Sequence, residues 1–324
     1  MTALLTRAAC DRADITRTQL AAAFQCCLTR VRKGVYVITG ECAIEDHGRL
    51  RATAVPASLP RAADVDRPGL LGHVAKMCVL VDSYRDSLPQ GSAFSHLSAG
   101  LMWGLPITRA LQNRAEAIRP GHAITYRQLL VRNRELPDSD VANRDAICLT
   151  TAARTVIDVA HDYPLDMSVP MIDTALSTNI VTAEELVARL AGSTPRRGIR
   201  RARRALSIAD PAHESPAESI CAVRFHEHGI DGFVPQILFG SPDDAFRARV
   251  DFLHREAKVI VEVNGEVKYK DGDAGSLLAR KERDRDYRLR NMGYRVYQLS
   301  WADLFGPRMF QEIRHTIRTT TPTS

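Results

Sequence analysis

Apolar and polar residues alternate along residues 247–271, RARVDFLHREAKVIVEVNGEVKYKD, on both sides of the segment HREA. A period of two is typical of half-buried strands, so the stretch predicts two strands joined by a tight turn. If the turn is centred on residues 255–258, Asp251 lies directly opposite Glu262, with Cβ atoms about 5 Å apart. The pattern therefore brings two carboxylates together where apolar side chains would be expected.

Helix signals occur at several other places along the chain. Thr16 is placed to cap RTQLAAAF, and Thr182 with Glu185 three residues later forms a capping box before an apolar pattern. Ser215 precedes Pro216, and Glu218 completes a second capping box. Further helices are expected in SHLSAGLMWGLPI, TTAARTVIDVAHDYP and SLLARKERDRDYRLRNMG.

Other segments read as strands. TRVRKGVYVI alternates around Gly34, and YRVYQLS follows the charged helix near the C-terminus. The apolar run MCVLVDSY, within the Pro- and Asp-punctuated residues 41–90, is also expected to be a strand. Residues 41–192 otherwise read as mainly helical and contain no motif that demands chemistry, so we assign them to structure or regulation.

Length and composition describe a multidomain globular protein. The chain has 324 residues, of which 45% are hydrophobic and 25% charged, and we expect two or three domains. Apolar runs are too short for a membrane span, and acidic residues come too early for a signal peptide, so we expect a cytoplasmic protein. The seven cysteines have one close pair, Cys26-Cys27, which fits neither a disulfide framework nor a C-x-x-C zinc site. Buried thiols are the expectation.

The net charge of +6 is unevenly distributed. Residues 212–324 contain 17 basic and 17 acidic residues, so the whole excess lies in residues 1–211. Part of it is the segment RRGIRRARR, with six arginines between Arg196 and Arg204. This segment is either a solvated helix face or a contact to a DNA backbone, and its composition marks a linker at residues 193–211. A basic excess suits an anionic partner such as nucleic acid.

The predicted carboxylate pair requires a compensating feature, because like charges directly opposite in a hairpin are destabilising. One carboxylate is protonated, a Lys or Arg cation lies between them, or a divalent metal does. Two carboxylates with a carbonyl or water suit Mg²⁺, which would activate water beside a phosphodiester. Lys268, Lys270 and Lys281 lie near enough in sequence to contribute a cation.

The residues VDF…VIVEVNG…K…RKERDRDYRLRNMGYRVYQLSW resemble actinobacterial proteins related to the very-short-patch-repair endonucleases, within the PD-(D/E)XK superfamily. The resemblance covers roughly residues 212–305. It implies metal ligation by Asp251 and Glu262, with Glu218 as a further ligand, although the capping box alone also explains Glu218. Asn264 stands where the superfamily has Lys, and Lys268 takes the place of a His found in relatives, so the implied catalytic set is Asp251, Glu262, Asn264 and Lys268. Arg280, Lys281 and Arg285 are the implied phosphate contacts.

The N-terminal segment ITRTQLAAAFQCCLTRVRKGVYVITG resembles the winged-helix domain of type IV toxin–antitoxin (abortive-infection) antitoxins. SAGLMWGLP and TTAARTVIDVA resemble the segments that follow in such proteins. The resemblance implies DNA binding, transcriptional repression and a cognate toxin or operator as partner. Arg17, Arg30, Arg32 and Lys33 would be the DNA contacts. From spacing alone, a small helical subdomain with a solvated basic edge explains the segment equally well.

Together these patterns predict an α/β multidomain protein. The expected parts are a winged helix-turn-helix at residues 1–40, a mainly helical antitoxin-like middle region at 41–192, an Arg-rich linker at 193–211, and a restriction-endonuclease-like α/β domain with a mixed sheet at 212–318. Two functions follow from this architecture. One is a DNA-binding, Mg²⁺-dependent nuclease that hydrolyses phosphodiesters; the other is a non-catalytic antitoxin-like repressor whose degenerate nuclease fold binds DNA or a partner.

Overall fold

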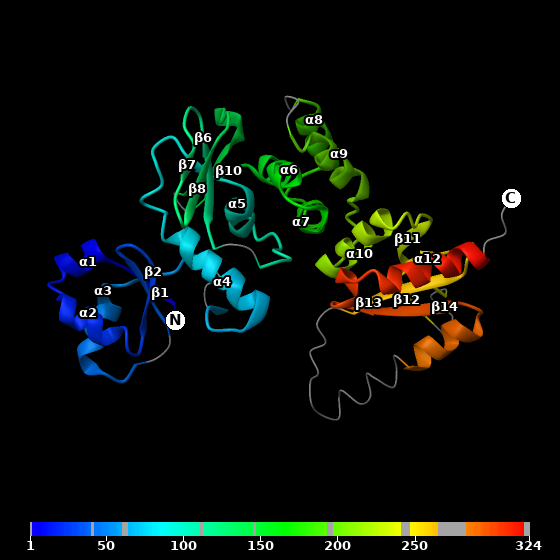
Figure 1. Cartoon of the computed structure of the whole chain (residues 1–324), viewed down its shortest axis with the longest axis horizontal. Helices are drawn as coiled ribbons and strands as arrows, with labels where there is room; N and C mark the ends of the chain where they lie inside the picture. Colours follow the sequence, from blue (N-terminus) through cyan, green and yellow to red (C-terminus); the bar gives the residue numbers. More distant parts are fainter. Residues whose placement is uncertain are drawn as a thin grey trace. The chain divides into compact units, whose positions relative to one another are not determined.

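The computed structural model of the chain describes residues 2–39, 42–59, 64–110, 113–144, 147–192, 197–240, 247–264 and 283–320. The chain divides into two compact units, Met1–Val159 and Ala160–Ser324, and the division falls within helix α6 (Ala152–Asp162) rather than in the Arg-rich segment (Figure 1). Within the described residues, no helix combines the length and the apolar character needed to span a membrane.

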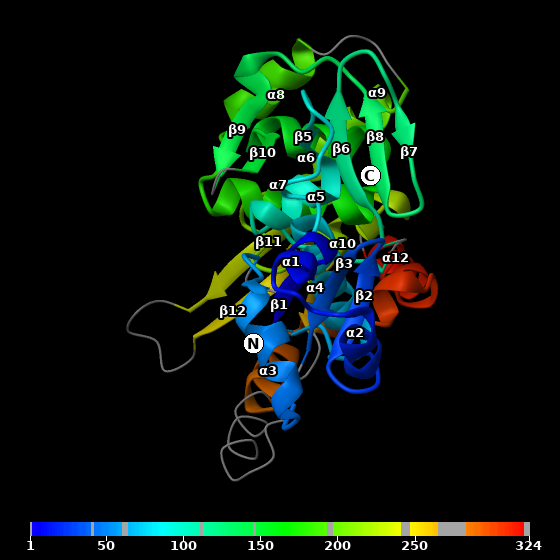
Figure 2. The ribbon, with the colours of Figure 1, turned by 90° about the vertical axis from the view of Figure 1, so that its left-hand side faces the viewer.

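The first part of unit 1, residues 2–59, is called here the N-terminal module. Its sheet has the order β2-β3-β1-β4, and Figure 2 shows its helices and strands facing the viewer. Its elements are β1 (Ala3–Thr6), α1 (Arg7–Arg12), α2 (Arg17–Ala23), β2 (Leu28–Arg32), β3 (Val35–Ile38), η1 (Glu45–His47), α3 (Gly48–Thr53) and β4 (Val55–Pro56).

Local signals explain the N-terminal module well. Thr16 caps α2 as predicted, and Gln19 completes a capping box with it. The predicted turn at Gly34, where φ is +75°, joins β2 to β3. A small core made by Leu5, Leu20 and seven further buried residues extends to Leu50 in α3. The module therefore ends later than the predicted boundary at residue 40.

The rest of unit 1 contains a six-stranded mixed sheet of order β7-β8-β6-β5-β10-β9 (Figure 2). Helices make up most of the regular structure described in residues 41–192, as predicted, but the sheet was not predicted, because strands of two to five residues are too short to show clear alternation. The elements are α4 (Gly69–Asp82), β5 (Ala93–Phe94), α5 (His96–Met102), β6 (Ala115–Arg119), β7 (Ile124–Thr125), β8 (Leu129–Asn133), η3 (Asp138–Asp140), β9 (Val141–Arg144) and β10 (Ile147–Thr150).

The apolar run MCVLVDSY, predicted as a strand, lies in helix α4 and the turn after it. Residues 77–82 are all buried, so the run is apolar on every side of the helix. A short continuous apolar run cannot be assigned to helix or strand by periodicity, and here the helical alternative is the correct one.

Unit 2 begins with helices α7 (Leu165–Ser177), α8 (Ala183–Ala191) and α9 (Ile199–Ile208). The predicted capping box of Thr182 and Glu185 begins α8. The Arg-rich segment expected to be a linker is helix α9 over most of its length, with Ala202 and Ala205 buried. At Gly198, where φ is +92°, a Cβ atom would lie 2.1 Å from the carbonyl oxygen of His161, so only glycine permits this close approach.

The C-terminal sheet has the order β11-β12-β13-β14. The first three strands are antiparallel and β14 runs parallel to β13, which gives the mixed sheet that was predicted. Its elements are α10 (Pro216–Glu227), β11 (Phe233–Phe239), β12 (Ala248–His254), β13 (Val259–Asn264), β14 (Arg295–Ser300), η4 (Asp303–Phe305) and α12 (Arg308–Thr320), with residues 283–291 also helical.

Two apolar clusters lie at this sheet. One joins Val259 and Val261 of β13 to α10 and α12 through residues such as Phe225 and Phe310. The other joins Ile260 of the same strand to Leu289 of the helix at residues 283–291. Because successive side chains of a strand point to opposite faces, Glu262 lies on the same face as Ile260, beneath the helix that contains Leu289. The fold thus fixes which helix can contact the carboxylate.

Candidate functional site

The carboxylate pair depends on the register of the β12–β13 hairpin. Phe252 pairs with Val261 and Leu253 with Ile260, which is the predicted register, and its continuation places Asp251 opposite Glu262. The Oδ2 atom of Asp251 accepts a hydrogen bond of 2.8 Å from the backbone N–H of Val263. The hairpin therefore brings the two carboxylates together as expected.

Glu262 has a cationic partner. Its side chain is buried and forms an ion pair with Arg285 of the helix at residues 283–291. Its second oxygen, Oε1, is buried and has no hydrogen-bond partner among the described residues. Burial raises the pKa of Glu262 to about 7, while Arg285 opposes the rise. Of the three ways to tolerate the pair, a basic side chain is present at Glu262.

Glu218 is the third carboxylate of this group. It begins α10, where its Oε1 accepts from the Ser215 hydroxyl at 2.7 Å and its Oε2 from Gln236 Nε2 at 2.8 Å. Burial raises the pKa of Asp251, and the negative charge of Glu218 adds to the rise. The charge of Glu218 thus acts on Asp251, and the charge of Asp251 in turn raises the pKa of Glu262.

The remaining residues of the predicted catalytic set are less informative. Asn264 is exposed, and its amide donates to Gln298 Oε1 at 3.2 Å. Lys268, Arg280 and Lys281 lie outside the described residues. Arg285, expected to contact phosphate, forms an intramolecular ion pair with Glu262. A guanidinium held by a buried carboxylate is a poor phosphate contact, because the partner charge would be left uncompensated.

The predicted DNA contacts of the N-terminal module differ in whether their side chains already have partners within the chain. Arg17, Arg30 and Lys33 are exposed. Arg32 donates to Ser83 Oγ at 3.0 Å and to Ser87 Oγ at 2.7 Å, and its guanidinium lies over the ring of Tyr84. Burial lowers the pKa of Arg32. Arg32 therefore ties β2 to the segment after α4, and the other three cations are the ones available to an anionic partner.

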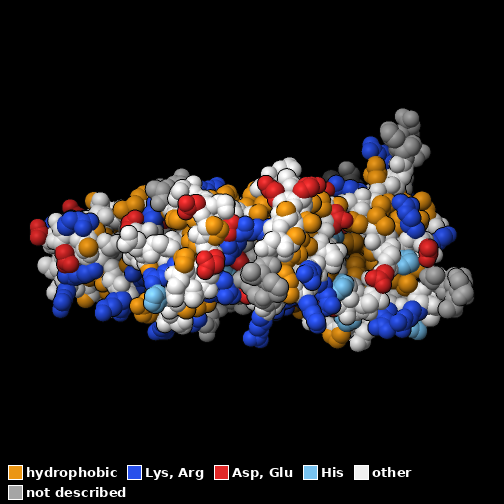
Figure 3. Space-filling model, turned by 90° about the horizontal axis from the view of Figure 1, so that it is seen from above, with side chains coloured by type: hydrophobic (Ala, Val, Ile, Leu, Met, Phe, Trp, Pro, Cys, Tyr) orange, Lys and Arg blue, Asp and Glu red, His pale blue; other side chains and the backbone are white. Residues whose placement is uncertain are grey.

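Basic side chains do not single out one interface by themselves. Figure 3 shows Lys and Arg side chains spread over the displayed face, interspersed with acidic ones. Helix α9 contributes Arg200, Arg203 and Arg204, which are exposed. Charge alone therefore does not distinguish a nucleic-acid interface, and the helices and strands that carry the basic residues have to be considered as well.

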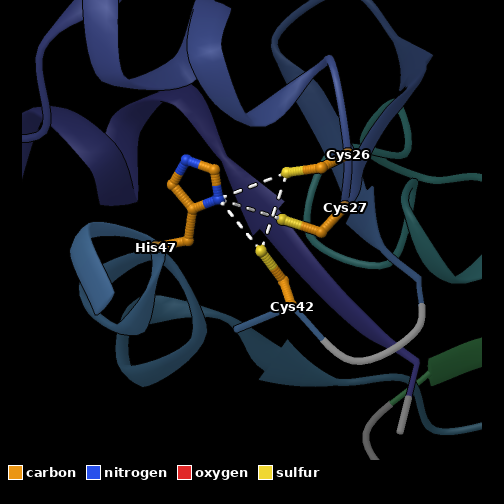
Figure 4. A group of neighbouring side chains, drawn as sticks. All are labelled: Cys26, Cys27, Cys42 and His47. Carbon is orange, nitrogen blue, oxygen red and sulfur yellow. Dashed lines mark hydrogen bonds between the residues drawn. The ribbon is translucent and has the colours of Figure 1, made fainter. Parts of the chain in front are cut away.

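A cluster of metal-ligating side chains lies in the N-terminal module (Figure 4). His47 Nδ1 lies 3.3 Å from Cys26 Sγ, 3.5 Å from Cys27 Sγ and 3.3 Å from Cys42 Sγ. Cys26 Sγ lies 3.6 Å from Cys42 Sγ. The four ligand atoms are all within 4.8 Å of one another, and among the described residues this is the group that could hold a metal ion.

The sequence argument against a cysteine metal site did not anticipate this cluster. It relied on the absence of a C-x-x-C pair, but Cys26 and Cys27 both lie in the turn between α2 and β2, so their thiols need not point to opposite sides. Cys42 and His47 approach from the segment between β3 and α3. The available signal was a Cys-Cys pair followed by one Cys and one His within about twenty residues, a looser version of known zinc-ligand spacings.

The thiols of the cluster differ in acidity. The backbone N–H of Ile44, together with His47, lowers the pKa of Cys42 to about 7. Burial raises the pKa of Cys27 to about 12, and its two cysteine neighbours add to the rise. One member of the cluster is therefore ready to be a thiolate, while another is held neutral unless a cation is present.

One comparison with known proteins concerns the middle of the chain. Residues 75–208 match the family model of the AbiEi antitoxin C-terminal domain. The match runs from within α4 to the end of α9, and it supports the antitoxin-like assignment of the middle region. It leaves the N-terminal module and the C-terminal sheet outside its bounds.

No curated protein matches the chain. Among solved structures, the chain is similar to the RV2827C protein from Mycobacterium tuberculosis, with 15% sequence identity and a TM-score of 0.36. The similarity covers 68% of this chain and 75% of that one. No conclusion about fold or function follows from a likeness at this TM-score.

Proposed function

We propose that the chain is a DNA-binding, antitoxin-like transcriptional regulator that does not cleave DNA. The observation that supports it most directly is the match of residues 75–208 to the AbiEi antitoxin C-terminal domain. The proposal places DNA contact in the N-terminal module and assigns the C-terminal sheet to binding a partner, with a cognate toxin as one such partner.

The N-terminal module has the parts that this function needs. Helices α1 and α2 are joined by a short turn, and β2 and β3 form a hairpin directly after them, which is the element order expected of a helix-turn-helix followed by a wing. Arg17 lies at the start of α2, Arg30 in the hairpin and Lys33 at its tip, all exposed. In such a module the start of the second helix contacts the groove and the hairpin contacts phosphates.

The C-terminal sheet fits a non-catalytic role. Arg285 already supplies a cation to Glu262, and Glu218 accepts hydrogen bonds from the Glu214 N–H, the Ser215 hydroxyl and Gln236 Nε2. Asn264 stands at the position of the motif lysine and is hydrogen-bonded to another amide side chain. These contacts neutralise or occupy the carboxylates without a metal ion.

DNA binding is tested by its salt dependence in the full chain. Replacing Arg17, Arg30 and Lys33 by Ala is expected to flatten the slope of log K against log salt by about 0.9 per lost phosphate contact, or about 1.8 from the two hairpin residues. Fluorescence anisotropy with a labelled duplex of mixed sequence at several salt concentrations measures the slope.

A matched control removes three exposed arginines from unit 2, Arg290, Arg308 and Arg318, and so changes the net charge equally. The slope of this variant is expected to stay near that of the wild type. If both triple variants flatten the slope to the same extent, binding follows net charge rather than the N-terminal module, and the assignment of the interface fails.

One observation favours a second candidate function, Mg²⁺-dependent hydrolysis of DNA. The buried Oε1 of Glu262 has no partner among the described residues, the charge of Asp251 raises the pKa of Glu262, and the charge of Glu218 raises that of Asp251. Asp251, Glu262 and Glu218 would hold the ion, which would activate water and neutralise developing charge. Nicking of supercoiled plasmid by the wild type with Mg²⁺, and not by the variant Asp251→Asn, would favour this candidate over the regulator.

A further inference from the structure

Four of the six separations among the ligand atoms in the N-terminal module match a tetrahedral zinc site, and all six are within 4.8 Å. With Zn–S bonds of about 2.3 Å and Zn–N bonds of about 2.0–2.1 Å, a tetrahedron separates sulfur from nitrogen by about 3.6 Å and sulfur from sulfur by about 3.8 Å. The observed separations are 3.3, 3.5 and 3.3 Å from His47 Nδ1 to the three sulfurs and 3.6 Å between Cys26 and Cys42. Each is within about 0.3 Å of its ideal value.

Hydrogen bonding alone does not account for this arrangement. A thiol is a weak donor and a weak acceptor, and Nδ1 of one imidazole can satisfy a single strong hydrogen bond, yet three sulfurs converge on it. Figure 4 shows the four side chains pointing toward one another from two separate segments. We propose that Cys26, Cys27, Cys42 and His47 bind one Zn²⁺ ion as a structural site.

The ligand set specifies the metal and its role. Three cysteines and one histidine form one of the closed, four-ligand sets of structural zinc, with no position left for substrate or water. Soft thiolates favour zinc over magnesium or calcium, which prefer oxygen. Binding releases the protons of the three thiols while the imidazole stays neutral, so the bound site carries one net negative charge.

The site would join two segments that the small core holds weakly. Cys26 and Cys27 follow α2 directly, and Cys42 and His47 lie in the connection from β3 to α3. Arg51 Nη2 donates to the carbonyl of Cys42 at 2.9 Å, and Cys26 Sγ donates to the carbonyl of Ala23 at 3.6 Å. Modules of this size commonly need a metal or disulfide in addition to their core.

Zinc would therefore hold α2 and the β2–β3 hairpin in one arrangement. This consequence rests on the proposed function, because those elements carry the cations assigned to DNA. Zinc binding itself does not depend on that assignment, so its test can be made without DNA.

The test measures zinc in the untagged full chain, purified without chelators. We expect one zinc per chain by elemental mass spectrometry. After zinc is replaced by Co²⁺, we expect the intense visible absorption of tetrahedral cobalt and a sulfur-to-cobalt charge-transfer band. Cys42→Ser is expected to lose most of the zinc, whereas Cys148→Ser, a cysteine of unit 1 outside the cluster, retains it.

A second variant covers the case in which Cys42→Ser does not fold. His47→Cys keeps four ligands as a Cys₄ site, so zinc is expected to remain and the charge-transfer band of the cobalt form to strengthen. Zinc-free wild-type protein that gives no tetrahedral cobalt spectrum would overturn the proposal. So would a disulfide between Cys26 and Cys42 in the freshly purified chain, detected by mass spectrometry after alkylation without reduction.

The two proposals fail separately. A chain that binds zinc but shows no salt-dependent DNA binding retains the zinc site and loses the regulator function. A chain that binds DNA with the expected slope but contains no zinc retains the regulator and loses the zinc site.

Discussion

The C-terminal sheet contains a cluster of carboxylates and the N-terminal module contains a cluster of thiols. The two clusters differ in whether a basic side chain lies against them. In the C-terminal sheet the carboxylates of Asp251 and Glu262 meet, and Arg285 from a neighbouring helix lies against one of them. In the N-terminal module three cysteine sulfurs lie within 3.5 Å of one histidine nitrogen, and two of these sulfurs lie 3.6 Å apart. The first cluster contains its own cation, whereas the second has the geometry to receive one.

The two clusters are therefore unequal evidence for a bound metal ion. Acidic residues in proximity are weak evidence for a metal when a guanidinium already compensates them. Thiols and an imidazole are stronger evidence when their separations match a tetrahedron, since no side-chain cation could occupy the same space. The comparison predicts a metal-dependent N-terminal module and a metal-independent C-terminal sheet.

The largest expected effect is the response to a zinc-selective chelator. Apparent binding free energies of structural zinc are about 10–16 kcal/mol in small zinc domains, so its removal should largely unfold the N-terminal module. Hydrogen exchange resolved by peptide is expected to accelerate strongly in residues 2–39 and to stay unchanged in residues 247–264. Equal acceleration in both segments would contradict the comparison.

The next effect concerns Glu262 and pH. Burial raises its folded-state pKa to about 7 from the 4.5 of an exposed glutamate, so between these values the folded chain binds more protons than the unfolded chain. The stabilisation that protonated Glu262 contributes to the folded chain is therefore fully present below about pH 4.5, and it is lost as pH rises toward and through 7. Urea unfolding of Glu262→Gln is expected to show a flatter pH profile and a stability higher by about 2 kcal/mol at pH 8.

The matched control for this experiment is Glu256→Gln, which removes a carboxylate from the exposed hairpin turn and should leave the pH profile unchanged. If Glu262→Gln is instead less stable than the wild type at pH 8, the ion pair with Arg285 outweighs the burial of the carboxylate. The C-terminal cluster would then be a stabilising ion pair rather than a tolerated one.

A smaller effect, on the unfolding temperature, tests whether Arg285 takes the place of a metal ion beside Glu262. Arg285→Met removes the guanidinium but keeps a long side chain, so Mg²⁺ is expected to raise the unfolding temperature of this variant by mass action. The wild type is expected to show no such shift, because Arg285 already occupies the position beside Glu262. A Mg²⁺-linked shift of the same size in both proteins would show that the arginine does not stand in for the ion, and would favour the nuclease candidate.

The smallest effect is that of Asp251→Asn in metal-free buffer. The substitution removes the repulsion from Glu262 and Glu218, and the side-chain oxygen can still accept from the Val263 N–H. Stability is expected to hold or to rise by a few tenths of a kcal/mol in thermal unfolding. A loss of more than about 1 kcal/mol would mean that the charge of Asp251 is stabilising, and that a cation lies closer to it than the described contacts show.

Features that depend on neighbouring residues could be predicted from the sequence. Thr16, Thr182 and Ser215 begin helices where predicted, because a cap satisfies backbone groups two or three residues away. The β12–β13 register followed from the alternation and the turn, since a one-residue slip would expose the buried face. The opposition of Asp251 and Glu262 was predictable for the same reason.

Features that depend on packing could not be predicted from local patterns. MCVLVDSY lies in and just after a buried helix because its surroundings are apolar on all sides, and the segment RRGIRRARR is largely a helix because Ala202 and Ala205 have a face to pack on. The strands of the middle sheet are stabilised by their partners, and runs of two to five residues carry too little pattern to be recognised alone.

The two clusters show the same division. Arg285 is one of several cations in a charged helix, and only the packing of that helix on β13 selects it as the partner of Glu262. Cys26 and Cys42 are 16 residues apart, and their meeting depends on how β3 returns past the end of α2. Caps and register are fixed by short-range hydrogen bonds, whereas ligand geometry is fixed by side chains converging from separate segments, which no local pattern specifies.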